Sequence, residues 1–412
     1  MKKLGYQTAF IGKWHLDEEP ATFDYYCVLT GQGKYFNPEF LIRGDQPWPK
    51  NKMQTEGHST DVITYITLKW LDKKRDKSKP FFLMCHFKAP HDMFENAKRY
   101  DDYLEDVEIP EPASLYYNGY NGSVATRGPN DDYISFIGTS VLKRNRWRNM
   151  GKDLKIDQSL VEDEYTHVSY QTYLKRYLRC VKGIDDNLAR LFDYLMKKEK
   201  LWDNTIIIYT SDQGMMLGEH DYIDKRWMYD KSMRIPLIIR YPQKVKKAFR
   251  SDAIINNTYF APTIIELADG KMPDYMQGIS FKSILETGRE PEGFPQETYY
   301  RYWMHMEDHM LPAHFGIRTK DYKLIFYYGS YYREFSLTKA ANYFIGFDTP
   351  PAWEFYNLKN DPNEMNNRYG DEAYAEIISD LKNRLATLRK NLNKGDEKYP
   401  KLKKIIEENW NK

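Results

Sequence analysis

The sequence predicts an α/β protein with a mixed, mainly parallel sheet flanked by helices, followed by a smaller C-terminal subdomain of antiparallel strands plus helix. In the first part of the chain, short continuous apolar runs alternate with segments of helical periodicity. After about residue 294 the runs become short, aromatic and alternating, which is typical of an antiparallel sheet. We therefore expect a large domain over 1–293, a subdomain over 294–392 and a charged, solvated tail over 393–412.

The first quarter of the chain is expected to fold as strand, loop, helix and strand. Residues 7–11 form a short apolar run, whereas residues 20–53 are too rich in glycine, proline and aromatic residues to predict regular structure. Residues 60–74 repeat apolar side chains every four positions, which predicts a helix. Residues 81–87 are continuously apolar, which is typical of a buried parallel strand.

A second group of elements completes the large domain. Glycine and proline punctuate residues 88–160, so we expect a long loop-rich excursion there. A single apolar stripe through residues 165–198 predicts a long helix. Residues 205–210 and 236–240 are apolar runs that predict buried strands, and residues 258–268 have the spacing of a short helix.

The subdomain is expected to hold a small sheet and one helix. Its predicted strands are the aromatic, alternating runs at residues 299–302, 315–318, 322–328 and 353–358. Residues 374–388 then carry an amphipathic stripe that predicts a helix.

Composition excludes several classes of protein. The 412 residues include 61 Lys and Arg against 59 Asp and Glu, and this near balance argues against nucleic-acid binding, which needs a strongly basic face. No apolar run approaches the roughly 20 residues of a membrane span. The 3 cysteines cannot build a disulfide framework. The 35 tyrosines fit either ordinary packing or a surface that stacks on sugars, and composition leaves both open.

A polar pair follows the predicted strand at 205–210. Asp212 and Gln213 carry hard oxygen ligands of the kind that Ca²⁺ or Mg²⁺ takes. In open α/β sheets, ligands bind beyond the carboxyl ends of the strands, which is where this pair stands. The same residues also suit a turn in which Asp212 hydrogen-bonds the following backbone, so both interpretations stay open.

Lysine and histidine residues stand at the exits of other predicted strands. Lys13 and His15 follow the first strand, and a spacing of two places their side chains on one side of an extended segment. His91 follows the next apolar run, and Lys225 lies in the charged run 218–226. Singly, each suits an ordinary loop. Together they suit hydrolysis of an anionic ester, because cations stabilise charge on the oxygens and imidazoles move protons.

The residues of these segments, and the order in which they occur, resemble the motifs of the sulfatase family of the alkaline-phosphatase-like superfamily. Similar motifs run almost end to end, at residues 5–16, 81–94, 211–226, 236–239, 260–263, 316–319 and 355–364. One departure is Tyr259, where the family usually has an acidic residue. The resemblance implies an alkaline-phosphatase-like fold, hydrolysis of sulfuric esters on sulfated carbohydrates, and a periplasmic, secreted or lysosomal location. It leaves the oligomeric state undetermined.

The resemblance also assigns catalytic roles. Lys13 and Lys225 would hold the sulfate oxygens. His15 would serve a hydrated aldehyde nucleophile, and His91 would contact the sulfate and protonate the leaving oxygen. The metal ligands on this chain would be Asp212 and Gln213, which would bind calcium.

The family's nucleophile is a formylglycine, made from Cys or Ser in a Cys/Ser-x-Pro-x-Arg motif. No such motif occurs in this sequence: Cys27, Cys85 and Cys180 do not fit, and the run SVATR at 123–127 imitates it only superficially. We therefore expect an N-terminally truncated sulfatase that lacks the nucleophile and two acidic calcium ligands, leaves apolar strand surface exposed and has little activity alone. The alternatives are an inactive glycan-binding protein and a phosphoryl-ester hydrolase of the same superfamily.

A region rich in aromatic rings and imidazoles is the candidate for reading the sugar. It contains Arg301, His305 and His309, which suit stacking on a glycan and hydrogen bonding to it, and equally suit an interface between subdomains. We also expect His220 to contact substrate, although its charged surroundings are equally typical of a solvated loop. The resemblance favours N-sulfoglucosamine or N-acetylglucosamine-6-sulfate as the type of substrate.

Overall fold

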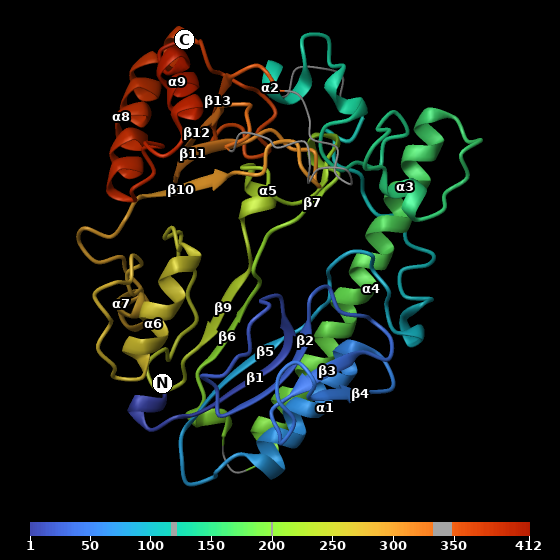
Figure 1. Cartoon of the computed structure of the whole chain (residues 1–412), viewed down its shortest axis with the longest axis vertical. Coiled ribbons are helices and arrows are strands. Elements are labelled where there is room, and N and C mark those ends of the chain that lie inside the picture. The colour runs from blue at the N-terminus through green and yellow to red at the C-terminus, as the bar shows by residue number, and fades with distance from the viewer. Residues whose placement is uncertain (117–121, 199–200, 333–347) are drawn as a thin grey trace.

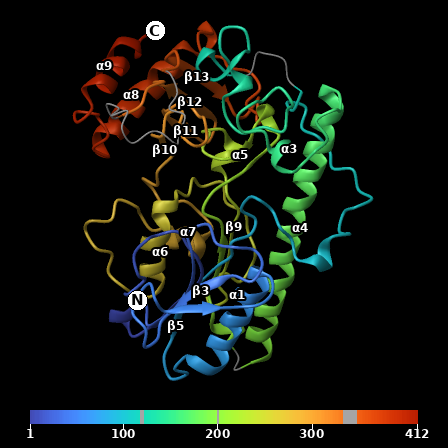
Figure 2. The same ribbon diagram turned by 45° about the vertical axis from the view of Figure 1, so that its right-hand side comes forward.

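The computed structural model describes residues 1–116, 122–198, 201–332 and 348–412. Figures 1 and 2 show an N-terminal sheet at one end of the molecule and a C-terminal sheet at the other, with one long helix along the side. A narrow two-stranded ladder lies between the two sheets. The mixed sheet with flanking helices and the separate antiparallel C-terminal sheet confirm the predicted fold class.

The N-terminal sheet has the order β4-β3-β2-β1-β5. Its strands are β1 (Gln7–Trp14), β2 (Tyr25–Thr30), β3 (Glu39–Ile42), β4 (Lys52–Gln54) and β5 (Phe81–His86). Strand β1 is parallel to both β2 and β5, whereas β3 and β4 are antiparallel to their neighbours. The parallel core therefore brings the carboxyl ends of β1, β2 and β5 to the same edge of the sheet.

One glycine sets how closely β1 approaches β5. Gly12 has a φ of +110°, and a Cβ atom there would stand 1.9 Å from the carbonyl oxygen of His86. No larger residue fits at that point without separating the two strands. Lys13 follows immediately, so its position depends on this close contact.

The prediction of irregular structure over 20–53 is wrong. The structure places three strands there, and residues 25–30 are a tyrosine- and β-branched-rich run that pairs with β1. The surrounding glycines and prolines obscured this run, because they belong to the turns between the strands rather than to the strands themselves.

The predicted helices are present. Helix α1 (Ser59–Lys69) continues as a π-helical turn at Trp70–Lys74, and α4 (Glu162–Lys197) runs along the side of the molecule and packs on α1. The loop-rich excursion is also confirmed, since its only α-helices in the described part are the short α2 (Val124–Arg127) and α3 (Met150–Asp153).

The two-stranded ladder consists of β6 (Ile207–Thr210) and β9 (Leu237–Arg240), which pair antiparallel. The prediction that these strands are buried is wrong, because their side chains are half-buried or exposed and Ile238 is 65% exposed. Among the described residues, no strand pairs with the second edge of β6 or the outer edge of β5. The apolar strand surface expected to be exposed is therefore present.

Short elements follow the two strands of this ladder along the chain. They are β7 (Met216–Leu217), β8 (Ile223–Asp224), α5 (Asp230–Met233), α6 (Phe260–Leu267) and α7 (Lys282–Thr287). Helix α6 lies within the helix predicted over 258–268.

The C-terminal sheet is antiparallel throughout, in the order β10-β11-β12-β13. Its strands are β10 (Glu297–Tyr302), β11 (His314–Thr319), β12 (Tyr322–Tyr327) and β13 (Ala352–Asn357), and the helices beside it are α8 (Ala375–Asn391) and α9 (Pro400–Asn409). The expectation of a solvated tail is wrong, because Leu402 and Ile406 of α9 are buried in the same hydrophobic cluster as this sheet. Apolar side chains four positions apart give α9 its packed face, while the lysines point away from the core.

The helices in the described part of the chain include none with both the length and the apolar character of a membrane span. This agrees with the absence of a long apolar run in the sequence.

Candidate active site

Charged side chains gather at the ends of strands from different parts of the chain. Burial, together with the positive charges of Lys88 and Lys225, lowers the pKa of Lys13 to about 8, while Asp212 and Asp92 oppose them. Such mutual effects require these groups to lie near one another. The structure therefore places Lys13, Asp212 and Lys225, which come from separate parts of the chain, near one another.

Lys13 stands near the carboxyl end of β1. Its ammonium group donates to the backbone oxygen of Gln32 at 3.0 Å. The second residue predicted from this strand, His15, lies just beyond β1 with an exposed side chain. The ammonium group of Lys13 is half-buried, so its charge acts in a medium less polarisable than water.

His91 is oriented by its neighbour. Its Nδ1 atom lies 2.6 Å from Oδ1 of Asp92 and 2.8 Å from the backbone oxygen of the same residue. Burial would raise the pKa of Asp92, but the hydrogen bond and charge of His91 outweigh burial and hold that pKa at about 2. With Nδ1 engaged, the Nε2 atom of His91 is the ring nitrogen left for a substrate. The hydroxyl of Tyr35 donates to the backbone oxygen of His91 and fixes the loop.

Lys88 is a site residue that sequence reasoning missed. It is only 6% exposed, burial lowers its pKa, and its ammonium group lies 4.6 Å from the centre of the Tyr35 ring. Among the described residues, no carboxylate lies at ion-pair distance from Lys88, so its charge is available to an anion. Its position directly after the apolar run 81–87 was the signal that could have found it.

A second group of charges borders Lys225. The carboxylate of Asp224 accepts from Arg226 at 2.9 Å and lies 3.4 Å from Nδ1 of His309. Burial would raise the pKa of Asp224, but His309 and Arg226 outweigh it and the pKa is lowered. Of the residues predicted to read the sugar, His309 therefore lies beside the charged cluster.

Asp212 and Gln213 follow β6, as predicted. The Asp212 side chain is exposed, and the Gln213 amide donates weakly to the backbone oxygen of Ser232 at 3.5 Å. Calcium takes about six to eight oxygen ligands. In the described ranges, no group of three or more His, Cys, Asp or Glu residues could hold a metal ion. These two side chains could supply part of a calcium site and do not complete one.

His220 and His305 occupy packed positions away from this cluster. His220 is 2% exposed and stacks on Tyr229 with ring centres 4.3 Å apart, and burial followed by the charge of Arg127 lowers its pKa to about 3. His305 is 1% exposed, and its Nδ1 accepts from the backbone N–H of Ala313. Substrate contact by either histidine stays a prediction.

Arg301 lies in the interior of the C-terminal subdomain. Its guanidinium is 2.7 Å from Asp396 and 3.4 Å from the centre of the Trp303 ring. Asp396 also pairs with Arg389 at 2.7 Å, so one carboxylate joins two buried arginines. Substrate binding by Arg301 likewise stays a prediction.

The described residues offer no activated thiol. Burial raises the pKa of Cys27 to about 12, of Cys85 to about 11 and of Cys180 to about 12, so all three stay protonated at neutral pH. Ser123, in the run that imitates the nucleophile motif, caps α2 by accepting from the backbone of that helix. Arg127 of the same run pairs internally with two aspartates.

The chain matches the sulfatase family over residues 1–270. The chain belongs to the sulfatase family. Residues 218–342 and 332–391 also match the C-terminal family of N-sulphoglucosamine sulphohydrolase. The chain is 35% identical to an N-acetylglucosamine-6-O-sulfatase of Bacteroides thetaiotaomicron, over 96% of this chain and 72% of that protein. It is 24% identical to an arylsulfatase of Clostridium perfringens, over 98% of this chain and 79% of that protein.

A solved structure supports the same assignment. It contains D-glucosamine-2-N,6-O-disulfate as substrate and superposes with a TM-score of 0.80 at 36% identity, covering 96% of this chain and 82% of that one. A phosphonate monoester hydrolase of Silicibacter pomeroyi superposes with a TM-score of 0.64 at 17% identity, which shows a shared fold alone. The relatives described above at 24% to 36% identity are thus sulfatases.

Proposed function

We propose that this sulfatase hydrolyses the 6-O-sulfate ester of a sulfated glucosamine. The carrying observation is that Lys88 and Lys225 lie near enough to Lys13 for their charges to lower its pKa, since three neighbouring ammonium groups suit the oxygens of a transferring sulfuryl group. The sugar is inferred from the N-acetylglucosamine-6-O-sulfatase and the disulfate complex described above.

Within this proposal each side chain has a role set by its surroundings. Lys13, Lys88 and Lys225 stabilise charge that builds up on the sulfuryl oxygens. His91, with Nδ1 engaged by Asp92, would donate a proton from Nε2 to the leaving sugar oxygen as the sulfuryl group passes to the family's formylglycine nucleophile, whose motif this sequence does not contain. The contact with Asp92 fixes the orientation of the His91 ring for this step.

Further residues are proposed at the edge of the site. His309 lies 3.4 Å from Asp224 and would contact the sugar rather than the sulfate. His15 is exposed at the end of β1 and is proposed to act on the nucleophile. We also propose that Asp212 and Gln213 contribute oxygens to the calcium ion that sulfatases generally use, whose charge would help to neutralise the sulfate.

Two other functions remain alternatives, and neither has stronger support. A sulfated-glycan-binding protein without turnover would use the same lysines for binding alone. A phosphoryl-ester hydrolase would use them for a phosphate, and the proteins of that activity share the fold at low identity. By analogy with the family, we also propose a periplasmic, secreted or lysosomal location. We likewise propose that the catalytic domain ends near residue 293, where the C-terminal subdomain begins.

The test measures binding and turnover on the same protein. We expect glucosamine 6-sulfate to bind in calorimetry, with affinity lowered at least tenfold in Lys225→Gln, and sulfate release to depend on His91. The matched control is His167→Ala, since that histidine also pairs with a carboxylate, at 2.8 Å from Glu111, away from the site. Turnover is measured with the missing Cys/Ser-x-Pro-x-Arg segment supplied. Under that condition, binding without sulfate release supports the glycan-binding alternative, and faster release of phosphate supports the phosphoryl alternative. No binding refutes the lysine cluster as an anion site.

A further inference from the structure

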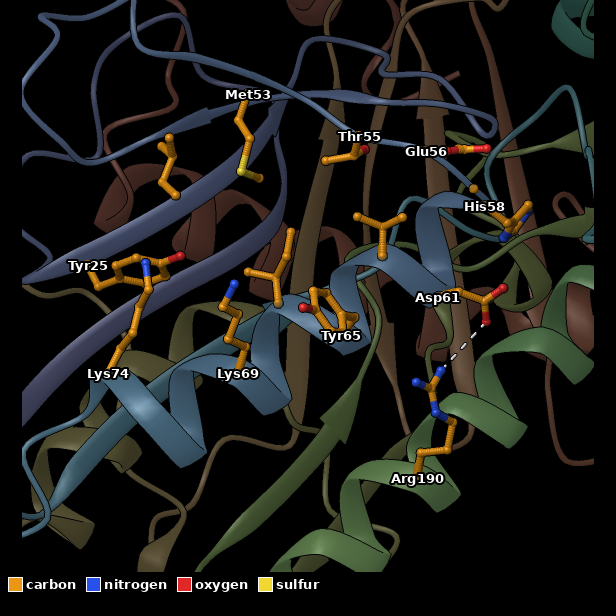
Figure 3. Close-up of a pocket in the computed structure, with 14 residues that line it drawn as sticks. Tyr25, Met53, Thr55, Glu56, His58, Asp61, Tyr65, Lys69, Lys74 and Arg190 are labelled. Carbon is orange, nitrogen blue, oxygen red and sulfur yellow. Dashed lines mark ion pairs between the residues drawn. The ribbon is translucent and has the colours of Figure 1, made fainter.

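A cavity lies on the face of the N-terminal sheet that α1 packs against, and Tyr35 stands between its lining residue His58 and Lys88. It has a volume of about 470 Å³, within the range of about 300–1,000 Å³ for small-molecule sites. Helix α1 packs on β1 and β5, whereas β3 and β4 lie at the other edge of the sheet. These two strands form the side of the cavity opposite the helix. The side chains that carry the argument come from β2, β3, β4, α1, the π-helical turn at Trp70–Lys74 and the loop before α1 (Figure 3).

One end of the cavity is basic. Lys74 lies 4.8 Å from the centre of the Tyr25 ring, and Lys69 lies 5.8 Å from that of Tyr65. In Figure 3 both ammonium groups point from the helix toward the cavity. Within the described ranges neither lysine has a carboxylate within ion-pair distance, although neighbouring lysines do, such as Lys73 at 3.0 Å from Asp72. Two ammonium groups are therefore free to bind an anion.

The middle of the cavity is apolar. Its walls are aliphatic and thioether side chains, namely Ile42, Met53, Val62 and Ile66. Figure 3 shows Met53 pointing from β4 toward α1. Water in such a space makes few hydrogen bonds, so an apolar group that displaces it gains free energy.

The opposite end disfavours a second anion. The Asp61 carboxylate accepts from both terminal nitrogens of Arg99, at 2.7 and 2.6 Å, and from Asn187 at 2.8 Å. It also lies 3.8 Å from Arg190, the cation that lines this end, so these charges already compensate one another (Figure 3). Glu56 is exposed and has no ion-pair partner in the described part of the chain. A ligand with one negative end is therefore oriented by the cavity, with that end toward the lysines.

We propose that this cavity binds a small amphipathic anion, with its acidic group against Lys69 and Lys74 and its apolar body between α1 and β4. The acidic group is a carboxylate, sulfate or sulfonate. Tyr65 is 58% exposed and offers a ring face at the mouth, which favours a flat or aromatic body. The site is independent of sulfate-ester hydrolysis, and its ligand is not a substrate.

The test uses naphthalene-2-sulfonate, which has a non-hydrolysable acidic group, and titration calorimetry at low salt. Because the catalytic lysines also attract sulfonates, binding is measured in a Lys225→Gln background. We expect binding there, a loss of about tenfold or more on adding Lys69→Gln and Lys74→Gln, and no loss on adding Lys73→Gln. The neutral naphthalene-2-sulfonamide is expected to bind at least tenfold more weakly than the sulfonate.

A second variant probes the apolar wall. Met53→Trp leaves both lysines in place and fills the space between β4 and α1, so it is expected to reduce sulfonate binding as well. The proposal is overturned if the Lys69 and Lys74 substitutions leave affinity unchanged, or if the sulfonamide binds as tightly as the sulfonate. None of these measurements depends on turnover, so their failure is distinguishable from failure of the sulfatase proposal.

Discussion

The lowered pKa of Lys13 predicts that sulfate binding weakens between pH 7 and pH 9. A lysine with a pKa of about 8 is about nine-tenths protonated at pH 7 and about one-tenth protonated at pH 9. If only the ammonium form holds the anion, apparent affinity scales with this fraction. The expected change is therefore about tenfold, equivalent to about 1.4 kcal/mol.

The assay is calorimetric titration of inorganic sulfate into the protein at several pH values. Lys13→Arg is the matched variant, because a guanidinium stays charged throughout this range. We expect its affinity to change much less with pH than that of the natural chain. Lys88→Arg is the second control, since burial also lowers the pKa of Lys88 and its titration could add to the effect.

Two results would refute this reasoning. Sulfate affinity that stays constant from pH 7 to pH 9 would mean that Lys13 keeps its proton or does not contact the anion. An equal decline in Lys13→Arg would assign the titration to another group, and a flat profile in Lys88→Arg alone would assign it to Lys88.

Three further substitutions test how charges stabilise the fold. Asp92→Asn is expected to lower the free energy of unfolding at pH 7 by about 1–2 kcal/mol. The reason is that a carboxylate whose pKa is about 2 in the folded protein stabilises the fold at pH values above its unfolded pKa. In urea titrations, the difference between the variant and the natural chain should shrink as the pH falls toward 2. Lys323→Met leaves the buried Glu364 unpaired and is expected to cost about 3–5 kcal/mol. Asp396→Asn leaves two buried arginines without their carboxylate and is expected to lower the midpoint of thermal unfolding clearly.

An exposed pair provides the control for these variants. Asp269 is 97% exposed and 4.0 Å from Lys282, so Asp269→Asn is expected to change stability by less than about 1 kcal/mol. A change of similar size in the exposed and buried variants would contradict the burial argument. A pH-independent effect of Asp92→Asn would contradict the linkage argument.

The spacing of apolar residues predicted most of the fold, because the side chains that recur at helix or strand spacing are the ones that pack in the core. Val62 and Ile66 recur at helical spacing and do face the core from α1. The strand at 25–30 escaped prediction because turn residues flank it closely. The packing of α9 escaped because Leu402 and Ile406 are few among many lysines, and only the subdomain sheet gives them a surface to cover.

The site was predictable to the extent that strand order determines it. Lys13, Asp212 and Lys225 could be expected together, since each follows a strand. The packing of His305 could not be predicted, because an imidazole among aromatic rings suits a buried cluster as well as a sugar-binding loop. What distinguishes the two is the hydrogen bond from Ala313, which no local sequence pattern indicates. Asp92 was missed because its role depends on a single side-chain pairing.

The contact of Gly12 with the His86 carbonyl has a consequence for how this enzyme could be altered. An alanine there would act as a wedge between two strands, and Lys13 at the next position would swing away from its partners. The lysines of the anion pocket can therefore be replaced by side chains of another length or charged group. The backbone at Gly12 accepts no such change, because even one added methyl group would collide with β5.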